Sequence, residues 1–90
     1  MGISNKHAYD AIPDIERWAR DKLKQANSDL DVRSVDYVFN RDLYRITFSK
    51  ERALKSRVVE LPEEWILLEE TRCEFVLGGA AREFLEDLMK

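Results

Sequence analysis

Two runs of alternating apolar residues, separated by a short polar turn, constrain the fold of this chain more than any other feature. In residues 33–49, RSVDYVFNRDLYRITFS, large apolar side chains occupy every second position on either side of a turn at residues 40–42. These side chains are Val35, Tyr37, Phe39, Tyr44, Ile46 and Phe48. A period of two places side chains on one face of a β-strand. The pattern therefore predicts an antiparallel hairpin with one apolar face.

The composition of the turn determines the predicted register of the two strands. Asn40 and Asp42 are residue types that tolerate the left-handed backbone required by tight turns. A tight turn here predicts three facing pairs, namely Phe39–Tyr44, Tyr37–Ile46 and Val35–Phe48. The opposite face of the hairpin is mostly polar and is expected to contact solvent, with Asp36, Val38, Arg45 and Thr47.

A helical pattern precedes the hairpin. Apolar residues recur every three or four positions, at Ile12, Ile15, Ala19, Leu23, Ala26 and Leu30. Pro13 stands in the expected first turn, where a missing N–H has no helical partner to lose. Glu16 and Arg20 form an i,i+4 pair of the favoured polarity. We predict a helix over residues 12–27.

The chain after the hairpin predicts a short third strand and two further segments. Residues 57–61 alternate, with Val59 and Leu61 on one face. Proline and two carboxylates at residues 62–64 suit the first turn of a helix. Residues 62–77 fit either a helix or a fourth strand in which Cys73, Phe75 and Leu77 alternate. The two glycines at 78–79 predict a break, and residues 80–90 predict a last helix.

These elements predict a single α+β domain over residues 1–90, in which residues 1–10 are a candidate flexible tail. A small antiparallel sheet, a hairpin plus a third strand, would be covered on one face by the N-terminal and C-terminal helices, in the order α-β-β-(β)-α-α. The α-β-β-β-α part of this order resembles that of the double-stranded RNA-binding domain. That family places a lysine cluster at the start of its last helix, whereas this chain reads GGAAREFLED there. No motif matches, and we assign no family.

Charge is distributed unevenly along the chain. The net charge is −3, yet residues 41–57 hold six basic and only two acidic residues. Residues 58–90 hold nine acidic and three basic residues. Two candidate interaction surfaces follow. The basic one comprises Arg41, Arg45, Lys50, Arg52, Lys55 and Arg57, and the acidic one includes Glu63, Glu64, Glu69 and Glu70.

No residue pattern predicts catalysis, a cofactor or a metal site. His7 and Cys73 are the only residues of their types, so one chain cannot assemble a Cys/His zinc site. A single cysteine in an apolar run is typical of a small buried residue rather than a nucleophile. Neighbouring carboxylates such as Glu69 and Glu70 point about 100° apart on a helix and predict a solvated face. The glycines at 78–79 lack the spacing of a phosphate loop.

The favoured function is a non-enzymatic protein-interaction module that binds an unknown protein or a second copy of itself. One version pairs residues 41–57 of one copy with the acidic segment of another. The alternative is nucleic-acid binding through residues 41–57, which the acidic pI of about 5.2 disfavours. The aromatic residues Trp18, Trp65, Tyr37 and Tyr44 are expected to pack in the core rather than to stack on bases. The longest uncharged run, residues 75–81, is far shorter than the roughly 20 residues of a membrane span, and we expect a cytoplasmic protein.

Overall fold

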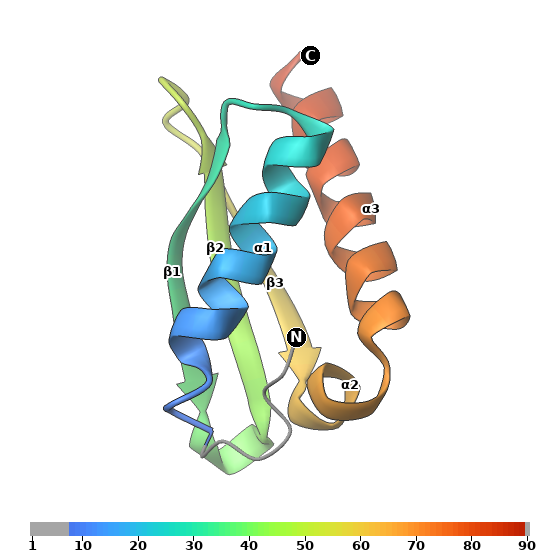
Figure 1. Ribbon diagram of the computed structural model, residues 1–90. Helices are drawn as coiled ribbons and strands as arrows, with labels where there is room; N and C mark the ends of the chain where they lie inside the picture. Colours follow the sequence, from blue (N-terminus) through green and yellow to red (C-terminus); the bar gives the residue numbers. More distant parts are fainter. Residues whose placement is uncertain (1–7, 90) are drawn as a thin grey trace.

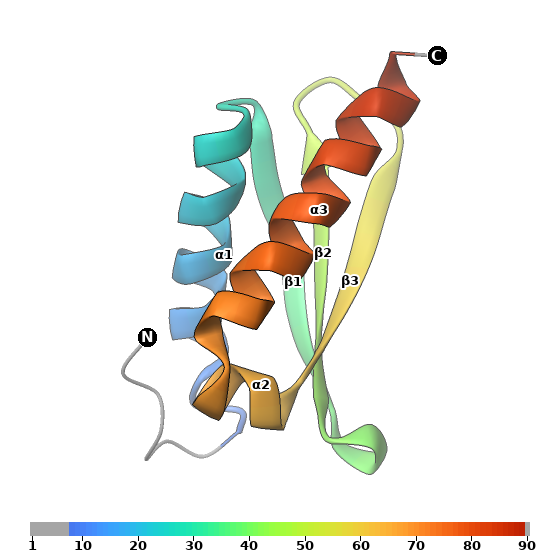
Figure 2. The same cartoon turned by 90° about the vertical axis from the view of Figure 1, so that its right-hand side faces the viewer.

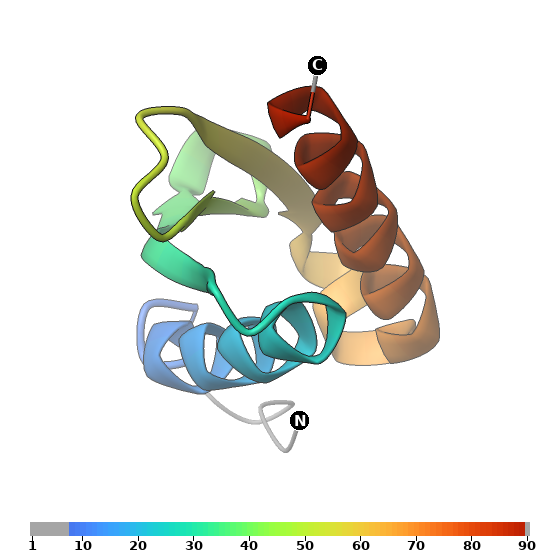
Figure 3. The same ribbon diagram turned by 90° about the horizontal axis from the view of Figure 1, so that it is seen from above.

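The computed structural model describes residues 8–89 and has the predicted α+β architecture. Its elements are α1 (Ile12–Ala26), β1 (Leu30–Val38), a 3₁₀ turn η1 (Phe39–Arg41), β2 (Leu43–Lys50), β3 (Ser56–Pro62), α2 (Glu63–Leu68) and α3 (Glu70–Leu88). The three strands form one antiparallel sheet in the order β1-β2-β3. All three helices lie on the same side of this sheet, with α1 beside β1 and α3 beside β3 (Figures 1 and 3). The fold class predicted from the sequence is confirmed.

Helix α1 forms because one of its faces is apolar and becomes buried. Ile15, Ala19 and Leu23 face the sheet and are almost completely buried. The helix ends because Asn27 adopts an extended backbone, with φ −161° and ψ 125°. Leu30, which we predicted as the last position of the helical stripe, therefore belongs to β1, where it is buried.

The hairpin has the predicted faces but a different register. Tyr37 pairs with Tyr44 and Val35 pairs with Ile46, so the predicted partners are wrong by two residues. The cause is the turn, which is longer than a tight turn. Phe39 begins the 3₁₀ turn and is 75% exposed, and the backbone reverses at Asp42, which has φ 49°. A shift of two residues leaves each strand side chain on its original face, so the face prediction is confirmed for the other five apolar residues and is wrong for Phe39.

A β-bulge extends the apolar face of β1 toward its start. The register shifts between Val32 and Ser34, so that Val32 lies opposite Phe48. One extra residue in a strand reverses the alternation beyond it. Leu30 and Val32 consequently share the buried face with Val35, although the sequence spacing from 32 to 35 is odd.

The chain after β3 forms two helices. Residues 63–68 form α2, residues 70–88 form α3, and the fourth-strand alternative is wrong. The predicted break at Gly78 and Gly79 is also wrong, because α3 continues through both. The packed face of α3 maintains the helix there, with Cys73, Leu77, Ala80, Ala81 and Phe84 buried. The third strand is confirmed, with Val59 and Leu61 both buried.

The core lies between the sheet and the helices. Tyr44, Ile46 and Phe48 of the central strand are buried beneath α1 and α3. The rings of Phe48 and Phe84 meet edge to face, with centroids 5.5 Å apart. Trp18, Trp65 and Tyr37 pack against this core, which confirms their predicted side of the fold. No helix within residues 8–89 is long and apolar enough to cross a membrane.

The residues before α1 also contact the sheet. The Tyr44 hydroxyl donates a 2.8 Å hydrogen bond to the Ala8 carbonyl oxygen, and burial raises the pKa of Tyr44 to about 12. The ring of Tyr9 packs edge-on against Tyr37 at a centroid distance of 5.3 Å. Residues 1–7 of the predicted tail, including His7, lie outside the described residues.

Candidate interaction surfaces

The six predicted basic residues do not form one surface. Arg45 and Glu60 lie directly opposite each other on β2 and β3, on the sheet face that no helix covers, with a guanidinium nitrogen 3.1 Å from Glu60 Oε2. Arg41, from the 3₁₀ turn, reaches the same carboxylate at 3.4 Å. Arg57 pairs instead with Glu83 of α3 at 2.9 Å. Half of the predicted basic surface is therefore neutralised by carboxylates of its own fold.

The other three basic residues lie together at one end of the molecule. Lys50 ends β2, and Arg52 and Lys55 belong to the loop that leads to β3. Arg52 has φ 68°, which turns the loop sharply. Within residues 8–89 no ion pair involves any of the three. They are the part of the predicted basic surface that stays available to a partner.

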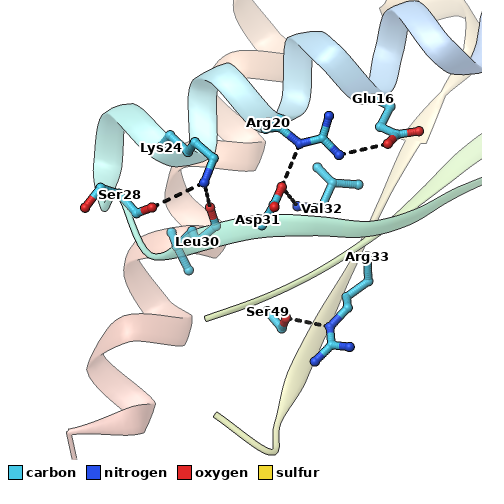
Figure 4. Close-up of polar contacts among 9 residues, drawn as sticks. All are labelled: Glu16, Arg20, Lys24, Ser28, Leu30, Asp31, Val32, Arg33 and Ser49. Atoms are coloured by element: carbon cyan, nitrogen blue, oxygen red, sulfur yellow. Dashed lines mark hydrogen bonds and ion pairs between the residues drawn. The ribbon is translucent and has the colours of Figure 1, made fainter. Parts of the chain in front are cut away.

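A polar groove of about 370 Å³ lies beside this loop, between the end of α1 and the starts of β1 and the 51–55 loop. Two of its cations are engaged in internal contacts (Figure 4). Lys24 Nζ donates to the carbonyl oxygens of Ser28 and Leu30, at 3.3 and 3.2 Å. Arg33 Nε donates to the buried hydroxyl of Ser49 at 2.7 Å. The groove is therefore largely a structural junction.

The same junction contains an ion-pair network that ties α1 to β1. Arg20 donates to Asp31 at 2.7 Å and to Glu16 at 2.8 Å (Figure 4). Asp31 also accepts the backbone N–H of Val32. The hydrogen bond from Arg20 lowers the pKa of Asp31 below its ordinary value, and the Asp31 bond raises the pKa of Arg20 further. This network orients the start of β1 against the helix.

The predicted acidic residues lie around α2, at the opposite end from the 51–55 loop (Figures 1 and 2). Glu63 Oε2 is 2.9 Å from the Tyr37 hydroxyl, which also lies 3.1 Å from Asp42 Oδ1. The hydrogen bond to Glu63 is the main reason that the pKa of Tyr37 is raised. The remaining acidic residues of this surface, Glu64, Glu69 and Glu70, are exposed. The molecule thus has a basic end and an acidic end, along a longest dimension of 41 Å.

Arg72 is a cation at the acidic end, near the start of α3. Its guanidinium lies 3.9 Å from the ring centroid of Trp65 and 3.5 Å from the carboxylate of Glu69. Helix α3 begins at Glu70, eight residues before Gly78. Its first residues read ETRCEF and contain no lysine cluster. The start of the last helix therefore lacks the lysine cluster of the double-stranded RNA-binding domain.

A third surface, which the sequence did not predict, lies between the free edge of β3 and α3. Within residues 8–89, β3 pairs with β2 on one side and with no strand on the other. Figure 2 shows β3 at the outer edge of the sheet, with α3 crossing beside it. A groove of about 400 Å³ runs between them, lined by Arg57, Val58, Val59, Glu60, Phe75, Val76, Gly79, Ala80 and Glu83.

This β3–α3 groove exposes apolar side chains on both faces of the strand edge. Phe75 of α3 is 79% exposed on the helix side, and Val58 is 46% exposed on the open face of the sheet. Between them lies Gly79, where an added Cβ would meet no atom within 4 Å. The sequence did not predict this surface, because residues 62–77 fitted either a helix or a fourth strand and the direction of Phe75 was undecided. Phe75 can be recognised as facing away from the core only when it is known which face of α3 packs against the sheet.

The chemistry expected of Cys73 follows from its burial. Its side chain is fully buried, and desolvation raises the pKa of the thiol to about 11. It lies on the packed face of α3 and not in the β3–α3 groove. In the part of the chain that the structure describes, no three His, Cys, Asp or Glu side chains are placed to hold a metal ion.

Comparison with known proteins gives no relative: no family model, no curated protein and no solved structure matches this chain.

Proposed function

We propose that this protein is a non-enzymatic protein-interaction module that binds an extended polypeptide segment along the free edge of β3. The observation that carries the proposal is a regular strand edge with exposed apolar side chains on both of its faces. An added strand would gain backbone hydrogen bonds from β3. Its side chains would cover Val58 on one face and Phe75 on the other.

The two edges of the sheet differ in how well they suit an added strand. Both edge strands carry charged residues, but the edge of β1 also contains the bulge at residues 32–34. A bulge is one of the usual means by which proteins keep an edge from pairing. The pairing of β3 with β2 has no such irregularity over residues 56–62. The free edge of β3 is therefore the one suited to accept a partner strand.

The exposed apolar side chains give the interaction a source of free energy. Burying a valine or phenylalanine side chain fully contributes about 1.5–3 kcal/mol. Val58 and Phe75 are already partly covered by the fold, so a partner gains part of this amount from each. Specificity would come from side chains that enter the groove beside Gly79.

Selection from a displayed library of random peptides tests this function without a known partner. Selected peptides should shift the NMR amide signals of residues 56–61, Phe75 and Gly79 of the labelled protein. Phe75→Asp and Val58→Lys should abolish binding while the fold, monitored by circular dichroism, is retained. Phe39→Asp is the matched control, because Phe39 is 75% exposed in the 3₁₀ turn, away from the groove. Peptides that bind these variants as well as the wild type would refute the proposal.

Nucleic-acid binding is the second candidate function, and one observation favours it. The loop between β2 and β3, which follows Lys50 and contains Arg52 and Lys55, lies at the end of the molecule opposite α2 (Figure 1). Titration with mixed DNA and RNA at low salt tests it. Binding that weakens steeply with salt and is lost in Lys50→Glu/Lys55→Glu would establish phosphate contacts. Absence of binding at low salt would eliminate this candidate.

We also propose that the protein functions in the cytoplasm. Cys73 is a free, buried thiol, and it is the only cysteine of the chain. A chain without an internal disulfide is typical of a reducing compartment.

A further inference from the structure

We infer that the segment bound along β3 is the β3 strand of a second copy, so that two molecules form a continuous six-stranded sheet about a two-fold axis at Val59. This inference rests on the proposed function, because it names the occupant of the same edge. Two copies of one strand pair antiparallel when a two-fold axis runs perpendicular to the sheet. Each copy then supplies the same surface to the other.

The strand boundaries select Val59 as the residue on the axis. Strand β3 spans residues 56–62, and Val59 is its midpoint. An axis at this position pairs all seven residues of one strand with all seven of the other. Ser56 then lies opposite Pro62 of the second copy, and Val58 lies opposite Glu60. An axis at any other residue leaves part of one strand unpaired.

The charges at the two ends of the strand are complementary in this arrangement. Lys55 immediately precedes β3 and Glu63 immediately follows it. A two-fold axis at Val59 places Lys55 of each copy opposite Glu63 of the other, which gives two equivalent ion pairs. Lys55 has no ion-pair partner within residues 8–89, so it is available for this contact. The pairing also brings the basic end of one molecule to the acidic end of its neighbour, as charge complementarity favours.

The position of α3 is compatible with the same two-fold axis. Along the β3–α3 groove, Arg57 is level with Glu83, because the two form an ion pair. Gly79 lies midway between Phe75 and Glu83 on the face of α3 that borders β3. In the pair of molecules, the two α3 helices run antiparallel on one side of the sheet, with Gly79 of each near the axis. A residue without a side chain at that position permits close approach of the two helices.

Glycine at position 79 has no reason within a single molecule. Its backbone is helical, and nothing lies within 4 Å of the place where a Cβ would be. Glycine inside a helix costs about 1 kcal/mol relative to alanine. Contact with a second copy would use the open space at Gly79, and the exposed Phe75 beside it would be covered by the same contact.

A charge exchange between Lys55 and Glu63 tests the arrangement by sedimentation equilibrium at low salt. The wild type should form dimers, and Lys55→Glu alone should raise the dimer Kd about tenfold or more, because two attractive pairs become repulsive. Glu63→Lys alone should do the same. The double variant Lys55→Glu/Glu63→Lys should restore the Kd to near the wild-type value, since the exchanged pair is again attractive.

Lys50→Glu is the control, because it changes the net charge equally but lies outside the paired strand. Its dimer Kd should stay close to that of the wild type. A wild type that is monomeric up to about 1 mM would overturn the inference. So would a dimer that the double variant does not restore, or one that Lys50→Glu weakens as much as Lys55→Glu. If a monomeric wild type still binds selected peptides at β3, the proposed function stands and only the second copy as occupant is rejected.

Discussion

Burial determines the chemistry of Cys73. The thiolate is the reactive form of cysteine, and a pKa raised to about 11 leaves the thiol protonated at neutral pH. We predict that native protein at pH 7 does not react with an aromatic disulfide reagent, and that it reacts with one equivalent after unfolding in guanidinium. Absorbance of the released thiolate measures both reactions. Fast reaction of the native protein would contradict the packing of Cys73 between α3 and the sheet.

Asp31 provides a second prediction at the scale of one residue, through the pH dependence of stability. Its pKa is lowered in the folded state by the hydrogen bond from Arg20, so the unfolded state binds the proton more tightly. The stabilisation is therefore present above the ordinary pKa of 3.8 and is lost as the pH falls through the lower folded value. Because the pair is exposed, Asp31→Asn should lower the free energy of unfolding at pH 7 by only about 0.5 kcal/mol.

Urea unfolding of wild type and Asp31→Asn at pH 7 and at acidic pH checks this prediction. The difference between the two proteins should shrink as the pH falls below the ordinary carboxyl pKa. Asp21→Asn is the matched control, because Asp21 is exposed on the same helix as Arg20 and forms no ion pair among residues 8–89. A difference that is unchanged at acidic pH would mean that Asp31 acts through packing and not through its charge.

At the scale of elements, α3 combines a well-packed face with two glycines that its own packing does not require. Gly78 and Gly79 have open space where a Cβ would be. Replacing either residue by alanine should raise the free energy of unfolding of the monomer by about 1 kcal/mol, because alanine has the higher helix propensity. Thermal unfolding measured at low protein concentration tests both variants.

The two glycines should differ in their effect on association. Both glycines line a hollow on the other flank of α3, beside Ala26 and Arg82, but only Gly79 also lines the β3–α3 groove. Gly79→Leu should therefore weaken dimer formation, and Gly78→Leu should leave it nearly unchanged. Equal effects of the two substitutions on the dimer Kd would place the interface elsewhere on α3.

The elements also show what the sequence could predict. Periodicity located α1, the two strands of the hairpin and β3, because a buried face repeats with the period of its secondary structure. The hairpin register could not be predicted, since the choice between a tight turn and the 3₁₀ turn at residues 39–41 leaves the alternation unchanged. The bulge after Val32 could not be predicted either, because it interrupts the period of two on which the strand prediction depends.

The extent of α3 and the β3–α3 groove were harder to predict from the sequence than the strands. Local propensity predicted a break at Gly78, but burial of Leu77, Ala81 and Phe84 on one face outweighs the cost of two glycines. The positions of charges along the chain did not reveal their pairing, because Arg45 meets Glu60 only across neighbouring strands. The β3–α3 groove depends on the packing of two elements and on an unpaired edge. Neither is a property of any single segment.

At the scale of the whole molecule, the fold separates a basic end at residues 50–55 from an acidic end around α2 (Figures 1 and 2). The strand with the regular free edge, β3, runs from one end to the other. A two-fold pairing along this strand would therefore join opposite charges at both ends and cover Phe75 in the middle. The proposed dimer would use the free edge of β3, bury the exposed phenylalanine, bring Gly79 near the axis and join the separated charges.

Hydrogen exchange of the β3 amides at low and high protein concentration tests this account most directly. Alternate residues of an antiparallel edge strand bond to the inner strand, and the others point their N–H groups outward. We predict that the outward-pointing amides of residues 56–61 exchange quickly in dilute protein and become protected at high concentration. The amides on the free edge of β1, residues 30–38, should not change. Protection that appears at β1 instead, or a dimer in which the β3 amides stay unprotected, would contradict the central claim.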